Sequence, residues 1–216
     1  MRLRNNPKAN EILENHKDIV VLNTKEYKGH WKNVFQNDNP IYIEIGMGKG
    51  DFIIENAKKY SHINFIGIEK FPSVLVGAIK KIDDDHLSLP NLKFMKEDAI
   101  FLNDVFEINE IDRIYLNFSD PWPKKKHAKR RLTSHTFLPI YQKILKNDGK
   151  LILKTDNRIL FEFSLISFQQ FHMNFQDICL DLHHSEGYDD NIQTEYERKF
   201  SPYGPIYRIE TTFKGE

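Results

Sequence analysis

Cysteine is nearly absent from this sequence, since Cys179 is the only one among 216 residues. An internal disulfide is therefore excluded, and the apolar alternation of "DICLDL" predicts that Cys179 fills core space. No apolar run approaches the roughly 18 residues that a membrane-spanning helix needs. The N-terminus "MRLRNNPKANEILENH" also lacks the apolar stretch of a signal peptide. These absences predict a soluble protein of the cytoplasm.

An excess of charge of either sign is also missing. Lysine plus arginine and aspartate plus glutamate number 31 each, so net charge predicts no attraction to nucleic acid or membrane. Any such signal must be local. The nine histidines, including His183 and His184, show no metal-ligand spacing with cysteines or acids, and we expect no metal.

Short β-branched runs alternate with helical patterns from Ile41 onward. Strands are predicted at 41–46, 63–69, 92–96, 111–118, 151–155, 177–183 and 206–213. Helices are predicted at 50–60, 72–82 and 134–146, with an Asp-Gly stop at 148–149 after the last of them. This order is typical of an α/β, Rossmann-like fold with a mostly parallel sheet and helices on both faces. No crossover helix separates the last two strands, so we expect that pair to be antiparallel.

The length fits one domain with a single core. Residues 31–216 are expected to form that domain. Residues 1–30 are polar and basic at their start, and they are expected to form an N-terminal arm or cap outside the sheet. A partly disordered tail is the alternative.

A glycine loop, "EIGMGKG" at 44–50, lies where the first predicted strand turns into the first helix. Glycines at such a turn let a ligand approach the backbone. Glu44 interrupts the apolar strand before the loop, and Glu69 ends the next strand about twenty residues later, as a ribose-binding acid does. Both acids could instead be solvent-facing strand ends. The candidate cofactor contacts here are Glu44, Gly46, Gly48, Gly50 and Glu69.

The acids around this loop favour a cofactor without phosphates. A nicotinamide dinucleotide needs its pyrophosphate at the helix N-terminus, where Asp51 would repel it. S-adenosylmethionine carries a cationic ammonium and sulfonium, which acids accommodate. Asp98, after the third predicted strand, could accept a hydrogen bond from its adenine amino group. The alternative for Asp98 is a helix N-cap before "AIFLNDVF".

The segment "SDPWPKKKHAKRR" at 119–131 places an acid beside six cations. The preceding strand delivers Asp120 to the carboxyl edge of the sheet, where open α/β folds bind ligands, and Pro121 and Pro123 stiffen the loop. The cations would hold a polynucleotide by its phosphates. A solvated charged face or a nuclear-import signal is the alternative. The cations are Lys124, Lys125, Lys126, Lys129, Arg130 and Arg131.

This segment resembles the signature of the tRNA (guanine-N7-)-methyltransferase family, which consists of class I S-adenosylmethionine-dependent enzymes. Five further blocks resemble that family in order along nearly the whole chain: "RLRNNPKA", "EIGMGKGDF", "GIEK", "LKTDN" and "TEYERKF". Lys126 and Ala128 stand where arginine and histidine are expected in many relatives, so the geometry toward phosphates could differ while positive charge persists.

The resemblance implies transfer of a methyl group from S-adenosylmethionine to N7 of a guanine in tRNA, in the variable loop. It implies that Glu44, Glu69, Asp98 and Asp120 line the cofactor site and that Asp120 is also catalytic. The implied tRNA contacts are Lys124, Asp156, Thr194, Tyr196 and Glu197, beside Lys126, Lys129, Arg130 and Arg131 of the basic run. Without the resemblance, Asp156 would be interpreted as a helix cap and "TEYE" as a solvated loop.

The chemistry asks little of a general base, because guanine N7 already carries a free lone pair, and positioning should dominate. Asp120 could accept hydrogen bonds from guanine N1 and its amino group and stabilise developing positive charge. Two alternatives stay open. One is methylation of a base amino group, since "DPW" lies where those enzymes carry an Asp-Pro-Pro-aromatic loop; the other is an RNA-binding module without catalysis.

Overall fold

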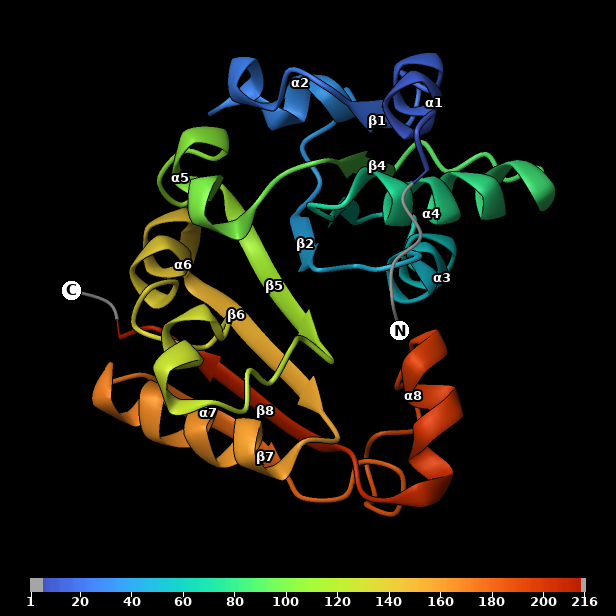
Figure 1. The fold of residues 1–216 in the computed structure, drawn as a ribbon. Helices are drawn as coiled ribbons and strands as arrows, with labels where there is room; N and C mark the ends of the chain where they lie inside the picture. Colours follow the sequence, from blue (N-terminus) through green and yellow to red (C-terminus); the bar gives the residue numbers. More distant parts are fainter. Residues whose placement is uncertain (1–5, 215–216) are drawn as a thin grey trace.

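Residues 6–214, which the computed structural model describes, contain one sheet of eight strands in the order β1-β4-β3-β2-β5-β6-β8-β7 (Figure 1). The strands are β1 (Val20–Val21), β2 (Ile41–Ile45), β3 (Asn64–Ile68), β4 (Leu92–Met95), β5 (Ile111–Asn117), β6 (Leu145–Thr155), β7 (Asn174–Cys179) and β8 (Tyr207–Thr212). β1 to β6 pair in parallel, and β8 runs antiparallel to both β6 and β7. The predicted α/β class and the antiparallel C-terminal strand pair are confirmed.

Helices cover both faces of this sheet. They are α1 (Ala9–Asn15), α2 (Trp31–Phe35), α3 (Asp51–Lys59), α4 (Pro72–Asp84), α5 (Leu102–Val105), α6 (Leu138–Ile144), α7 (Arg158–Gln170) and α8 (Glu195–Phe200). Alternate residues of a strand point to opposite faces, and β3 shows this. Phe65 packs in the cluster formed with α1, α3 and α4, whereas Ile66 and Ile68 pack in the cluster that includes residues of α5, α6 and α7.

Several predicted boundaries differ from the structure, and strand pairing explains two of the differences. The helix predicted at 134–146 ends at Ile144, and β6 begins at Leu145, so the Asp-Gly pair lies inside the strand. A Cβ at Gly149 would lie 2.9 Å from the Lys146 carbonyl oxygen. The close approach of the backbone at these two residues therefore requires glycine at position 149. β7 begins at Asn174 rather than at 177, because its pairing with β8 starts there.

The N-terminal stretch adds to the sheet. Residues 1–5 of the predicted arm lie outside the described residues, whereas Val20–Val21 pair in parallel with β4 at the sheet edge. The stretch therefore does not lie wholly outside the sheet, and the division into arm and domain stays a prediction. Cys179 is buried, as the sequence predicted.

Within residues 6–214, no helix has the length and apolar character needed to cross a bilayer. The same part of the chain holds no group of three or more histidine, cysteine, aspartate or glutamate side chains placed to bind a metal ion.

Candidate active site

A cavity of about 750 Å³ lies at the carboxyl edge of the sheet. Its walls come from the ends of β2 and β3, the segment after β4, the loop after β5 and the basic run. Six residues predicted from the sequence line it: Gly46, Glu69, Asp98, Asp120, Lys129 and Arg130. Chain segments that are far apart in the sequence thus bring acids and cations to one cavity.

The glycine loop turns tightly beneath this cavity. Gly46, Gly48 and Gly50 have φ values of 77°, 58° and 77°, a left-handed conformation that favours glycine. A Cβ at Gly46 or Gly48 would meet nothing within 4 Å, whereas one at Gly50 would lie 3.0 Å from the Ala78 Cβ. The first two glycines therefore leave open space beside the backbone, and the third lets α3 approach α4.

Glu44 is buried beneath the turn with 1% of its surface exposed. Asn117 donates a hydrogen bond from Nδ2 to its Oε1 at 2.8 Å, but Oε2 is buried and has no hydrogen-bond partner among the described residues. Burial raises the pKa of Glu44 to about 8, although Asn117 and the Lys154 charge oppose this rise. An unsatisfied buried carboxylate oxygen suits a cationic group of a ligand.

Glu69 and Asp98 lie at the ends of the next strands. Glu69 is 8% exposed, and its Oε1 accepts a hydrogen bond from the Phe71 backbone N–H at 3.0 Å. Burial raises its pKa, against the effect of nearby backbone N–H donors. Asp98 accepts from the Ile100 N–H at 3.2 Å and caps a 3-10 helix, yet it also lines the cavity. Both interpretations of Asp98 therefore fit the geometry.

The loop after β5 is held in an unusual backbone conformation. Phe118 and Trp122 have φ values of 50° and 40°, which residues other than glycine rarely adopt. Arg131 is buried and donates from Nε to the Pro121 carbonyl at 2.9 Å and from Nη2 to the Trp122 carbonyl at 3.1 Å. These bonds hold the loop so that exposed Asp120 stands at the cavity.

The rest of the basic run faces solvent. Lys125–Arg130 form a 3-10 helix, and the Arg130 guanidinium lies 4.9 Å from the centroid of the Trp122 ring. Lys129 and Arg130 reach the cavity, whereas Lys124 and Lys126 are exposed without lining it. The predicted tRNA contact of Arg131 stays a prediction, although its guanidinium is turned toward the loop.

Asp156 and Tyr196 meet, although they are 40 residues apart in the chain. The Tyr196 hydroxyl donates to Asp156 Oδ2 at 3.0 Å. Burial and then this bond raise the pKa of Tyr196 to about 12. The Tyr196 ring also lies 5.1 Å from the Phe118 ring and 4.2 Å from the Phe200 ring, centroid to centroid. This aromatic cluster places the "TEYE" segment beside the loop that carries Asp120.

Glu197 points into the protein. Its carboxylate is fully buried and accepts from Lys154 Nζ at 2.6 Å and Asn191 Nδ2 at 2.7 Å. The Thr194 side chain accepts from the Glu197 backbone N–H at 2.9 Å and completes a capping box at the start of α8. The predicted contacts of Thr194 and Glu197 with tRNA stay predictions.

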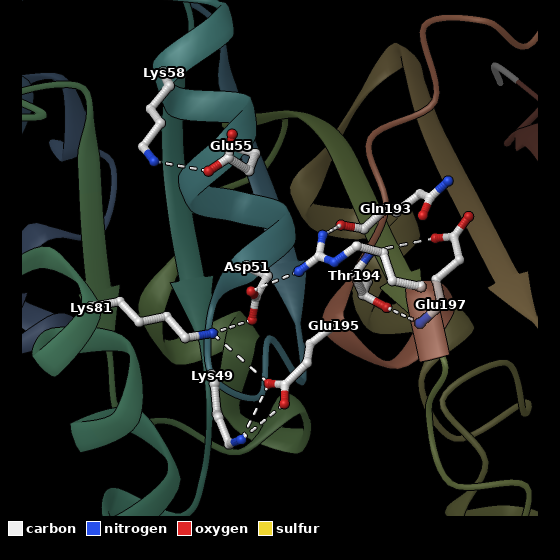
Figure 2. Close-up of polar contacts among 10 residues, drawn as sticks. Lys49, Asp51, Glu55, Lys58, Lys81, Gln193, Thr194, Glu195 and Glu197 are labelled. Atoms are coloured by element: carbon white, nitrogen blue, oxygen red, sulfur yellow. Dashed lines mark hydrogen bonds and ion pairs between the residues drawn. The ribbon is translucent and has the colours of Figure 1, made fainter. Parts of the chain in front are cut away.

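A charged cluster fixes α8 to α3 and α4 (Figure 2). Arg198 Nη2 donates to Asp51 Oδ1 at 2.9 Å, and Lys81 pairs with the same carboxylate. Lys49 Nζ donates to Glu195 Oε1 at 3.1 Å. The glycine loop and the "TEYE" segment are thereby joined across the molecule.

Three residues that the sequence did not single out either hold a predicted site residue or line the cavity. Asn117 holds Glu44, Lys154 holds Glu197, and Ser119 lines the cavity with a buried Oγ that has no hydrogen-bond partner among the described residues. Asn117 and Lys154 each interrupt an apolar strand. That interruption is the same signal that identified Glu44.

The known sequences that resemble this chain are described as methyltransferases. The sequence model of a family described as "Putative methyltransferase" matches residues 38–207. The chain is 52% identical over 214 residues to the tRNA (guanine-N(7)-)-methyltransferase of Listeria monocytogenes, covering 99% of both chains. It is 50% identical over 217 residues to the protein of that name from Bacillus cytotoxicus, covering 100% of this chain and 99% of that one.

Solved structures share the fold at low sequence identity. An antibiotic-related methyltransferase superposes with a TM-score of 0.64 at 17% identity, over 85% of this chain and 93% of that one. The 16S rRNA methyltransferase KamB gives a TM-score of 0.63 at 10% identity, over 87% and 94%. These matches show a class I methyltransferase fold.

Proposed function

Because the chain belongs to the tRNA (guanine-N7-)-methyltransferase family, whose members transfer a methyl group from S-adenosylmethionine to N7 of a guanine in tRNA, we propose that its target guanine lies in the variable loop. The chain is thus an enzyme with tRNA as substrate and S-adenosylmethionine as methyl donor. We also propose that it acts in the cytoplasm.

The residues around the glycine loop fit this cofactor, which supplies a methyl group on a positively charged sulfur. We assign the unsatisfied Oε2 of Glu44 to the cofactor's ammonium group and Glu69 to the ribose hydroxyls. Asp98 is assigned to the adenine amino group. The open space beside Gly46 and Gly48 supports a close approach of the cofactor to the backbone.

Asp120 is the proposed catalytic residue. It accepts hydrogen bonds from guanine N1 and the exocyclic amino group, turns N7 toward the methyl group and stabilises the charge that develops on the ring. No proton must leave N7, so a carboxylate in this exposed position suffices. The strained loop and its Arg131 bonds keep Asp120 in place before tRNA arrives.

The proposed tRNA surface joins the basic run to the Asp156–Tyr196 pair. Lys124, Lys126, Lys129 and Arg130 neutralise phosphates, and the exposed part of Tyr196 offers a ring face to a base. Arg131 and Glu197 contribute by holding the loop and α8 in position. The observation that carries the assignment is the single cavity shared by Glu69, Asp98 and Asp120 with Lys129 and Arg130.

The test is to locate the methyl group. Purified enzyme, S-adenosylmethionine and unmodified tRNA are incubated, and ribonuclease fragments are analysed by mass spectrometry. We expect 7-methylguanosine in the variable-loop fragment. A methyl group in another fragment would contradict the proposed position. A methyl group on a base amino group, or none at all, would contradict the assignment to N7.

A further inference from the structure

A second cavity, of about 420 Å³, shares no lining residue with the one just described. Its floor comes from β2, β5, β6 and β8, one wall from α3, and the other wall from residues 182–192. Its volume lies within the range of small-molecule sites. The methylation chemistry described above uses none of this space.

The lining is rich in aromatic rings. Phe52 and Tyr115 lie edge to face with centroids 4.9 Å apart, and Tyr42 lies 6.2 Å from Tyr115. Tyr60 at the end of α3 and Tyr188 on the opposite wall complete the set. Such rings offer planar surfaces on which a planar group can stack.

Arg113 carries the unpaired charge of this cavity. Its guanidinium lies 4.5 Å from the centroid of Tyr42, and Nη1 donates to the Tyr115 hydroxyl at 3.2 Å. Nε is buried and has no hydrogen-bond partner in the described part of the chain. Among residues 6–214 no carboxylate oxygen lies within 4.0 Å of the Arg113 guanidinium nitrogens. An arginine with free donors in a partly buried site favours an anion.

The other charged groups of the cavity are already paired. Lys154 binds Glu197 at 2.6 Å, and Arg208 pairs with Asp177 and Glu210. Asp190, at the rim, accepts from Lys59 Nζ at 2.6 Å. The cavity therefore presents one unpaired cation and several tyrosine rings.

We propose that this cavity binds one nucleotide, with its phosphate on the Arg113 guanidinium and its base against the tyrosine rings. A planar base and an anionic phosphate in one small unit match both features of the lining. A free nucleoside monophosphate and a single nucleotide of bound tRNA share this chemistry. Either would bind in addition to the guanine that is methylated, because the two cavities are separate.

The experiment compares Arg113→Met with Lys150→Met in the full-length protein. Lys150 is the register partner of Arg113 on β6 and pairs with Glu210, but it does not line the cavity. Tyr60→Ala removes one ring from the wall and provides a second variant if Arg113→Met does not fold. Calorimetry with AMP, GMP and inorganic phosphate tests the free nucleotide, and filter binding tests tRNA.

Loss of a charge-assisted hydrogen bond should weaken binding about 10-fold to 100-fold in Arg113→Met, and Tyr60→Ala should weaken the same ligand. Lys150→Met should bind like wild type. Loss of mononucleotide binding with unchanged tRNA affinity identifies a free-nucleotide site. Loss of tRNA affinity without measurable mononucleotide binding identifies a nucleotide of tRNA, and loss of both supports a site that accepts either source.

Three results would overturn the proposal. The first is that the affinities for mononucleotides and for tRNA are both unchanged in Arg113→Met and Tyr60→Ala. The second is that inorganic phosphate binds as tightly as AMP, which would show that no base is recognised. The third is that Arg113→Met alters the sedimentation coefficient, which would show that the cavity is a protein interface instead.

Discussion

The Lys154 ammonium and the Glu197 carboxylate form an ion pair of 2.6 Å, with side chains only 4% and 0% exposed. The pair joins β6 to the first turn of α8, so it connects the sheet to the segment that carries Tyr196. Asn191 Nδ2 and His183 Nε2 lie within hydrogen-bond distance of Glu197 Oε1, at 2.7 Å and 3.1 Å. Because both oxygens of the Glu197 carboxylate have partners within the protein, this side chain holds the start of α8 in position.

Breaking this pair from one side should destabilise the fold strongly. Lys154→Met leaves a buried carboxylate without its cation, which costs about 3–5 kcal/mol in other proteins, and urea denaturation measures the loss. Lys58→Met is the matched control, because Lys58 pairs with Glu55 at 2.8 Å on the partly exposed surface of α3 (Figure 2). Exposed pairs contribute little. Equal losses in the two variants would show that Lys154 and Glu197 do not form a buried pair.

Glu44 should make stability depend on pH. Its pKa of about 8 in the folded state exceeds the ordinary value of 4.5, so between these pH values the native state binds more protons than the unfolded chain. The free energy of unfolding should therefore fall as pH rises from about 5 to 8. Glu44→Gln should flatten this slope in ligand-free protein, whereas Glu14→Gln, at an exposed position of α1, should not. A slope that persists in Glu44→Gln would exclude Glu44 as its source.

Cofactor affinity should depend on Glu69. Removing a carboxylate that pairs with a ribose diol leaves those hydroxyls without partners, at about 1–3 kcal/mol, so Glu69→Ala should bind S-adenosylmethionine roughly 5-fold to 150-fold more weakly by calorimetry. Glu14→Ala provides the control. Unchanged affinity in folded Glu69→Ala would remove this residue from the site.

The sequence predicted the parts of the site that interrupt regular patterns. Glu44 breaks an apolar strand and Glu69 ends one, so both could be found from the sequence. The prolines around Trp122 likewise indicated a stiff loop. Contacts between distant segments carry no such local signal. The Asp156–Tyr196 bond and the inward turn of Glu197 depend on how the chain after β7 returns to the sheet.

One misplaced boundary and one missed strand have the same origin. The Asp-Gly pair at 148–149 suggested a stop between helix and strand, but pairing of Leu145 with Ile111 draws the preceding residues into β6. The edge strand at Val20–Val21 is only two residues long, too short for an alternation pattern to reveal it. Pairing with a neighbouring strand determines both the start of β6 and the presence of the edge strand. The register of that pairing cannot be recognised in a single sequence.

The exposed cations should govern how tRNA binding responds to salt. Lys126→Glu, Lys129→Glu and Arg130→Glu combined should weaken binding and flatten the plot of log affinity against log salt, because fewer counterions are released. A matched triple variant, with Lys32, Lys80 and Lys143 changed to glutamate, carries the same charge change on exposed positions of α2, α4 and α6. We expect the control variant to keep the wild-type slope and the basic-run variant to show a flatter one. Equal slopes in both variants would place the basic run away from the RNA.

Asp120→Asn should separate chemistry from binding. Asparagine keeps the size of the side chain and the loop bonds from Arg131, but it removes the negative charge beside the reacting base. It also presents an amide that donates where guanine N1 and the amino group donate. Turnover should therefore fall far more than affinity for tRNA or for S-adenosylmethionine, since the charge acts mainly as positive charge develops on the ring.

Single-turnover methylation of saturating tRNA measures that fall in Asp120→Asn directly, and filter binding and calorimetry measure the two affinities on the same protein. Asp84→Asn is the comparison, because Asp84 is exposed on α4 and does not line the cavity, so the same charge is removed away from the base. It should retain the single-turnover rate, since it leaves the field at the base intact. If Asp120→Asn loses tRNA affinity, cofactor affinity and rate by similar factors, then Asp120 holds the loop together rather than acting on the guanine. In that case the catalytic assignment would have to move to another group lining the cavity.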